Sequence, residues 1–138
     1  MFSGMTNNTL DSKGRIILPV KFREELGESF YITSGFEDCL QVISTERFEN
    51  YSEQIKQMPG DVAASIQYVL IAPAVEVTPN AQGRISIPQA LREQAGLDKN
   101  VVVLGMDTRI EIWDSEKFEQ FQKQQREAAK RNLQFIKL

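Results

Sequence analysis

Short apolar runs separated by polar turns organise the chain into a pattern that occurs twice. Residues 11–27 form a polar turn, a β-prone run over 16–18, and a short helix that carries Phe22 and Leu26 on one face. Residues 80–96 repeat this order, and seven of their seventeen positions are identical at a shift of 69. Such self-similarity indicates one structural unit that is used twice. The identical pairs are Gly14/Gly83, Arg15/Arg84, Ile16/Ile85, Pro19/Pro88, Arg23/Arg92, Glu24/Glu93 and Gly27/Gly96.

The similarity continues beyond Gly27 at an offset of 70. The runs 40–43 and 110–113 correspond, and both alternate in the way that half-buried strands do. Ser44 and Asp114 follow these runs and can cap the helices that come next. Each half therefore predicts a β-β-α-β-β unit followed by a longer helix.

Each half is too short to bury a full core alone, so we expect the two halves to interlock about a pseudo-two-fold axis. The predicted fold is α+β, with two tandem β-β-α-β-β repeats forming one β-barrel-like domain with flanking helices. Asp61 is predicted to cap the second of two linker helices. The predicted organisation is repeat 1 over 5–47, a helical linker over 48–73, repeat 2 over 74–117, and a C-terminal helix or tail over 118–138.

The C-terminal segment is rich in helix-forming and basic residues. Phe118 and Phe121 face the same side, which predicts docking against the fold, but apolar spacing weakens beyond Lys123, where a frayed end or tail is expected. A solvated helix face is the favoured interpretation of the basic charges, and a tail that contacts DNA or another subunit is the alternative.

Composition excludes several classes of function. The chain has no histidine and one cysteine, Cys39, so neither a transition-metal site nor an internal disulfide is expected. No nucleophile elbow, phosphate loop or dinucleotide motif is present, and we expect no enzyme activity, cofactor or small-molecule substrate. No apolar run approaches ~18 residues and no secretory signal is present, so no membrane partner is expected, and the single cysteine fits a reducing compartment.

Basic residues are concentrated in the first repeat, although the whole chain has a net charge of −3. Four of them lie within the eleven residues 13–23, and polar side chains nearby can donate to phosphates or base edges. Arg15 can simply pair with Asp11, yet a surface ion pair contributes only ~0–1 kcal/mol, which favours a binding role. The candidate DNA-binding residues are Asn8, Asp11, Ser12, Lys13, Gly14 and Arg15. Arg15 and Lys13 would contact DNA, Asp11 would orient Arg15, and Gly14 would let the turn approach the backbone.

The second turn, which contains Gln82, Gly83 and Arg84, is a secondary candidate with a DNA-binding or a structural role. Asn80 replaces the acid of the first turn, and Gln82 replaces its lysine. We therefore predict one copy that faces DNA and one copy kept mainly for fold or assembly. The alternative is that both copies reach DNA unequally.

These motifs resemble the MraZ family. The resemblance rests on the Asp11-x-Lys13-Gly14-Arg15 turn, the Pro19 helix, the box from Gly83 to Arg92, the opening Met1-Phe2 with Gly4, and residues 111–114. It covers the chain from Met1 to about Phe121. The resemblance implies two AbrB-like (SpoVT–AbrB) swapped-hairpin repeats, with the family's Asp-x-x-x-Arg DNA-binding motif at Asp11 and Arg15.

The same resemblance implies a bacterial, cytoplasmic and nucleoid-associated transcriptional regulator that forms homo-oligomeric rings. Its partner would be double-stranded DNA, at repeated promoter sites upstream of the division and cell-wall gene cluster and of its own gene. Two alternatives remain open, namely an antitoxin-like AbrB module with a protein partner and an oligomeric interaction ring that does not bind DNA.

Overall fold

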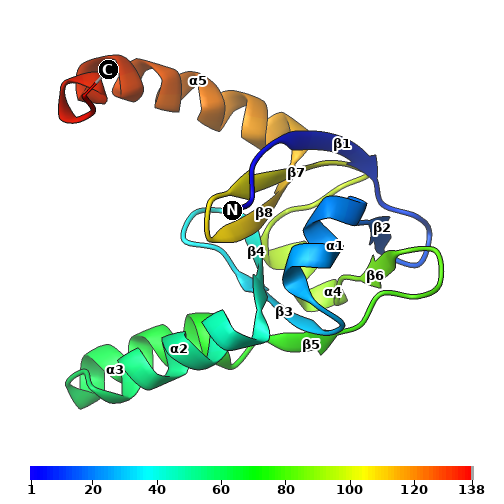
Figure 1. Cartoon of the computed structure of the whole chain (residues 1–138), viewed down its shortest axis with the longest axis horizontal. Coiled ribbons are helices and arrows are strands. Elements are labelled where there is room, and N and C mark those ends of the chain that lie inside the picture. The colour runs from blue at the N-terminus through cyan, green and yellow to red at the C-terminus, as the bar shows by residue number, and fades with distance from the viewer. Residues whose placement is uncertain (138) are drawn as a thin grey trace.

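Strands from the two halves of the chain alternate in the main sheet, as the computed structural model of residues 1–137 shows (Figure 1). The sheet has six strands in the order β1-β7-β8-β4-β3-β5, and β2 and β6 form a separate two-stranded ribbon. The strands are β1 (Met5–Thr9), β2 (Arg15–Ile17), β3 (Phe30–Ser34), β4 (Leu40–Ser44), β5 (Val75–Val77), β6 (Arg84–Ser86), β7 (Asn100–Met106) and β8 (Arg109–Asp114). The helices are α1 (Val20–Leu26), α2 (Thr45–Lys56), α3 (Gly60–Ile66), a π-helical segment η1 (Gln67–Ile71), α4 (Gln89–Gln94), α5 (Ser115–Asn132) and a 3₁₀ turn η2 (Leu133–Phe135).

Each repeat contributes its first strand to the other repeat. β1 pairs with β7 from Met5↔Leu104 to Thr9↔Asn100, and β5 pairs with β3. The ribbon joins the repeats again, because Ile16 of β2 lies opposite Ile85 of β6. The predicted α+β fold with two interlocked repeats is confirmed. The main sheet does not close into a barrel, since β1 and β5 remain its two edges.

The core lies between the main sheet and a layer made of the β2–β6 ribbon, α1 and α4. Equivalent side chains of the two repeats meet there, because the positions that are apolar in both units point inward. Ile17 and Val20, whose counterparts are the polar Ser86 and Gln89, are exposed. The ribbon, α1 and α4 contribute Ile16, Leu18, Phe22, Leu26, Ile85, Ile87, Leu91 and Ala95, all of them buried.

A second, smaller core lies under α5 on the other face of the sheet. Trp113 stacks on Phe121 with ring centroids 4.5 Å apart and lies 5.7 Å from Phe118, which confirms the predicted docking of this helix. Because β4 and β8 are covered on both faces, they are buried almost throughout, and the prediction of half-buried strands is wrong. The polar Gln41 and Glu111 that caused the apparent alternation are themselves buried.

The helix starts follow the predicted caps in two cases and differ in a third. Ser44 accepts a hydrogen bond from the backbone N–H of Arg47 at 3.2 Å, and Asp114 accepts one from Lys117 at 3.4 Å. Asp61 does not cap α3, which begins at Gly60, so that Asp61 lies in the first turn. An acid there still interacts favourably with the helix dipole.

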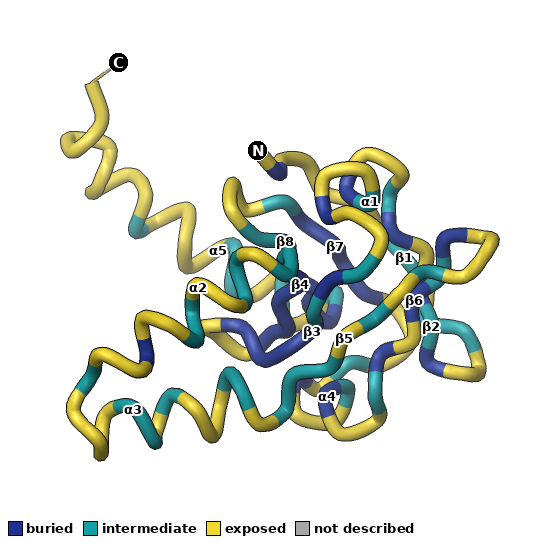
Figure 2. The backbone as a smooth tube through the Cα atoms, turned by 60° about the horizontal axis from the view of Figure 1, so that its bottom comes forward, coloured by how far each residue is buried: buried dark blue, intermediate teal, exposed yellow. Residues whose placement is uncertain are grey.

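The two helical arms project from the side of the sheet away from the β2–β6 ribbon (Figure 1). One arm consists of α2, α3 and η1, and the other is α5, which is helical to Asn132, so that of the helix or tail predicted for this segment the structure has a helix. Both arms are mostly exposed at their outer ends (Figure 2). Among residues 1–137, no helix is long and apolar enough to span a membrane.

Candidate nucleic-acid interface

The first Gly-Arg turn is held by a dense set of short hydrogen bonds centred on Asp11. The Asp11 Oδ1 accepts from the backbone N–H groups of Lys13 and Arg15, both at 2.9 Å. The backbone N–H of Gly14 donates to the Asp11 carbonyl at 3.0 Å. Gly14 has φ of 73°, a left-handed conformation that a residue without Cβ adopts without strain. The turn therefore presents Ser12 and Lys13 at its exposed tip.

The second turn has the same backbone geometry with an amide in place of the acid. Asn80 Oδ1 accepts from the N–H groups of Gln82 at 3.0 Å and Arg84 at 2.9 Å. Gly83 has φ of 79° and donates to the Asn80 carbonyl at 2.9 Å. An amide oxygen can thus replace the carboxylate as the acceptor that shapes the turn. It supplies no negative charge for the arginine that follows.

The β2–β6 ribbon brings the two turns onto one face of the molecule. The backbone N–H of Ile87 donates to the Gly14 carbonyl at 3.0 Å, and that of Leu18 donates to the Gly83 carbonyl at 3.2 Å. Each turn is thereby fixed to the strand end of the opposite repeat. Movement of one turn must disturb the other.

Asp11 lies between the two repeated arginines. Its Oδ2 accepts a hydrogen bond from Arg15 Nε at 2.8 Å, and the Nε of Arg84 lies 4.0 Å from the same oxygen. The backbone N–H of Arg15, helped by its side chain and by the N–H of Lys13, lowers the pKa of the Asp11 carboxyl. The acid is therefore ionised at neutral pH and orients Arg15 by a charge-assisted hydrogen bond. The two arginines are each about one third exposed, so their guanidinium groups remain accessible from solvent.

Arg23 and Arg92 also belong to this face, and sequence reasoning assigned them no role. Arg92 Nε donates to the Ile87 carbonyl at 2.9 Å, and its guanidinium lies against Gly14, where an added Cβ would come 2.7 Å from Cζ. Arg23 is placed in the same way at the other turn. Its Nε donates to the Leu18 carbonyl at 3.1 Å, and a Cβ added at Gly83 would come 2.7 Å from its Cζ. The sequence did indicate that these two arginines matter, because they form one of the pairs that are identical in both repeats. The crossing from one repeat to the turn of the other could only be seen in three dimensions.

The remaining candidates differ in how they are placed. Lys13, Ser12 and Gln82 are exposed at the turn tips. Asn8 is half-buried, and its Nδ2 donates to the Ile17 carbonyl at 2.7 Å while its Oδ1 accepts from Thr6 at 2.9 Å. These bonds tie β1 to β2, so Asn8 supports the turn from behind.

The result is a small, strongly positive face on an acidic chain. Four guanidinium groups and the Lys13 ammonium surround the two turns, with Asp11 as the acid that forms ion pairs there. The face lies opposite the helical arms (Figure 1). Guanidinium groups in such a position can bind phosphate or the edge of guanine bidentately.

Comparisons with known proteins agree with this architecture. Residues 1–65 and 70–136 match the family described as "MraZ protein, putative antitoxin-like". The chain therefore belongs to the MraZ family.

Curated relatives span nearly the same length as this chain. A protein named "Transcriptional regulator MraZ" from Caldanaerobacter subterraneus subsp. tengcongensis is 45% identical over 126 residues, which cover 89% of this chain and 87% of the relative. Proteins of the same name from Acetivibrio thermocellus and Micrococcus luteus are 44% and 42% identical, over 88% and 93% of this chain and 86% and 91% of theirs. Membership of this family makes the chain a transcriptional regulator.

Proposed function

We propose that this regulator acts by binding duplex DNA through the face formed by its two Gly-Arg turns. In this proposal Arg15 reads base edges, Lys13 and Ser12 contact the phosphate backbone, and Gly14 allows the close approach. Asp11 fixes the orientation of Arg15, and Arg84 makes a second, weaker contact. No step of this function requires a cofactor, a metal or catalysis.

The observation that carries the proposal is the sharing of Asp11 by arginines from both repeats. Arg15 is held by a direct hydrogen bond, whereas Arg84 is 4.0 Å from the same carboxylate and follows an asparagine turn. The two arginines therefore address one ligand from one face, but only Arg15 is pre-oriented. A bidentate arginine–guanine contact is worth ~1–3 kcal/mol of discrimination, or roughly 5- to 150-fold in affinity.

One such face is too small to give tight binding alone, so we propose that several copies act together. A homo-oligomer larger than a dimer would present several faces to repeated sites, and the coupling raises the effective concentration of each later contact. Sites spaced by about one helical turn, roughly 10–10.5 bp, place successive faces on the same side of the duplex. The proposed targets are promoter repeats upstream of the division and cell-wall genes and of its own gene, and the proposed location is the bacterial cytoplasm at the nucleoid.

The direct test is a titration of the pure protein against DNA from upstream of its own coding sequence, with scrambled DNA as the control. Arg15→Ala and Arg84→Ala are compared in the same assay, with circular dichroism and size-exclusion chromatography to confirm folding and assembly. We expect Arg15→Ala to abolish specific binding, because the loss is repeated in every subunit. Arg84→Ala is expected to retain most of the affinity.

Two results would count against this assignment. If the assembled wild-type protein binds upstream and scrambled DNA equally, the face has another ligand, such as a protein partner. If Arg84→Ala loses the upstream DNA as completely as Arg15→Ala while both remain folded, the two turns contribute equally.

A further inference from the structure

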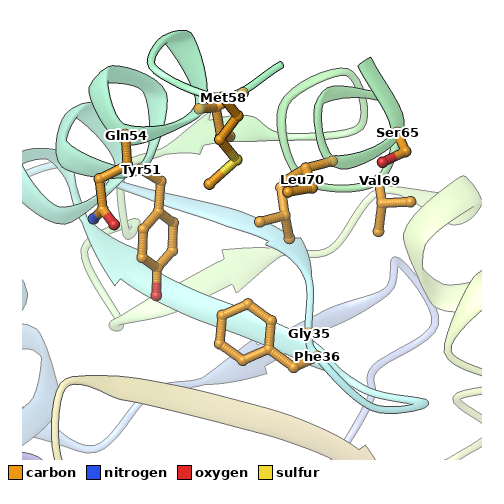
Figure 3. Close-up of a pocket in the computed structure, with 10 residues that line it drawn as sticks. Gly35, Phe36, Tyr51, Gln54, Met58, Ser65, Val69 and Leu70 are labelled. Carbon is orange, nitrogen blue, oxygen red and sulfur yellow. The ribbon is translucent and has the colours of Figure 1, made fainter. Parts of the chain in front are cut away.

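An apolar groove lies between the helical arm formed by α2, α3 and η1 and the β3–β4 loop (Figure 3). The arm projects on the side of the sheet away from the proposed DNA-binding face (Figure 1). It has a volume of about 540 Å³, and almost all of its lining is apolar. Phe36, from the β3–β4 loop, and Val69, from η1, are each about half exposed there. The lining residues are Gly35, Phe36, Tyr51, Gln54, Ile55, Met58, Ser65, Ile66, Val69 and Leu70.

The walls of this groove are built as a stable site. Thr33 Oγ1 donates to the Leu70 carbonyl at 2.7 Å, which fixes η1 to the sheet. Phe36 and Tyr51 lie 6.3 Å apart as a tilted aromatic pair. The π-helical geometry of η1 is a rare feature that often marks functional positions. The helix pair and η1 bury only Ile55 completely, and Val62, Tyr68 and Val69 are exposed.

The other helical arm ends in a matching apolar surface. Leu133, Phe135 and Ile136, here named the apolar tip, are all exposed, and Phe135 is 82% exposed. The tip follows α5, a helix of 18 residues and therefore about 27 Å long. In both views this helix ends well away from α2 and α3 of the same chain (Figures 1 and 2). The tip cannot reach its own groove without a break in α5.

The segments that carry the two surfaces have opposite net charge. Residues 36–61, which supply the β3–β4 loop and α2, contain six acidic and two basic residues. Residues 118–137, which lead to the apolar tip, contain five basic and two acidic residues. Opposite charges around apolar surfaces favour a defined pairing and oppose contact between two like surfaces.

We propose that the apolar tip of one copy binds in the groove of the next copy. This proposal deepens the proposed self-assembly and rests on it. The donor and acceptor surfaces differ, so the contact is head-to-tail and repeats around a closed ring when the rotation closes. The DNA-binding faces lie opposite the arms and stay free in every subunit. The basic tail then serves subunit contact rather than DNA.

The experiment uses light scattering coupled to size-exclusion chromatography on three groups of variants of the full chain. The first variant stops after Asn132 and removes the tip. The second group places a charge in the groove, as Val69→Asp or, on a different element, Phe36→Asp. The matched control is Tyr68→Asp, the neighbouring residue on η1, which is 79% exposed and does not line the groove.

We expect both groove variants to be monomers of about 15.7 kDa and the tip deletion to be a slightly lighter monomer, all with unchanged circular dichroism. Tyr68→Asp is expected to keep the wild-type mass. In an equal mixture, the tip deletion supplies an intact groove and Val69→Asp supplies an intact tip. The two should therefore form a heterodimer of about twice the chain mass. Neither variant can dimerise alone.

Three outcomes would overturn the inference. They are an unchanged mass in the tip deletion, an unchanged mass in both groove variants, and a mixture that stays monomeric although each variant alone is monomeric. A monomeric wild-type protein would instead remove the proposed assembly itself. The DNA-binding proposal is tested independently of assembly with the monomeric tip deletion. If that proposal is right, this variant still binds a single upstream site more tightly than scrambled DNA.

Discussion

The two turn glycines offer a matched pair of substitutions, Gly14→Ala and Gly83→Ala. Both residues have positive φ, at 73° and 79°, and both are buried. In each case an added Cβ would lie 2.7 Å from the Cζ of an arginine of the other repeat, Arg92 or Arg23. The backbone strain and the displaced group are therefore the same in kind at both sites.

The expected cost can be worked out from these conformations. A residue with a Cβ in the left-handed region costs ~1–2 kcal/mol. The guanidinium that it meets is the end of a flexible side chain and can move, so that contact adds little to the stability loss but changes where the arginine lies. For a chain of this size ~1 kcal/mol lowers Tm by about 4 °C, so we expect both variants to melt about 4–8 °C below the wild type.

Binding should separate the two variants although stability does not. Gly14→Ala moves Arg92 and distorts the turn that carries Arg15 and Lys13, and we expect at least a tenfold loss of affinity for the upstream DNA. Gly83→Ala distorts the turn that carries Arg84 and Gln82 and should lose less. The measurements are urea unfolding followed by circular dichroism, and fluorescence anisotropy with labelled DNA, below the Tm of both variants.

The reasoning is refuted if the two variants differ by more than ~2 kcal/mol in unfolding free energy, because the strain would then not be equivalent. It is also refuted if both are equally stable and lose DNA affinity to the same extent. That second result would mean that the turns contribute equally to binding.

Four further predictions concern the first Gly-Arg turn and Cys39. Asp11→Asn should keep the turn, as Asn80 does in the other repeat, but free Arg15; we expect an almost unchanged Tm and a lower ratio of specific to non-specific affinity by anisotropy. Lys13→Ala should reduce the slope of log affinity against log salt concentration by about one per bound turn, and an unchanged slope would show that Lys13 makes no phosphate contact. Burial raises the pKa of the Cys39 thiol to about 12, so a thiol reagent at pH 8 should leave it unmodified until urea unfolds the chain. Because the unfolded thiol ionises near pH 9, its contribution to stability is intact below that pH and should decline above it, which unfolding curves from pH 8 to 11 can detect.

Local chemistry made most of the repeated unit predictable. The Gly-Arg turns, the prolines before α1 and α4, and the glycines after them specify backbone conformations that few other residues adopt well. The interlocking of the halves followed from the shortness of each core. The Ser44 and Asp114 caps were predictable because they rest on contacts between residues three positions apart.

The features that sequence reasoning missed depend on contacts between distant residues. The burial of Gln41 and Glu111 arises because helices cover the second face of the sheet, with α5 against β7 and β8 and α2 against β4, so a polar residue inside a strand gave a misleading alternation. Glu111 is satisfied there by the Nε of Arg109 and the indole N–H of Trp113, both at 2.9 Å. The sharing of Asp11 by Arg84 likewise depends on the register of the ribbon, which joins residues 69 positions apart in equivalent turns.

The exchange of strands between repeats within one chain has a consequence for the symmetry of the proposed DNA-binding face. Two identical single-repeat chains joined in this way would carry identical turns, and any substitution would change both. In this chain the two turns are separate parts of one sequence, so each can be substituted without changing the other. They already differ at the residue that accepts hydrogen bonds from the arginine, which is Asp11 in one turn and Asn80 in the other. We therefore expect the face to bind DNA more strongly at the Asp11 turn than at the Asn80 turn. A DNA site that is itself asymmetric fits such a face better than a palindromic site does. The repeated sites are therefore expected to be direct rather than inverted repeats.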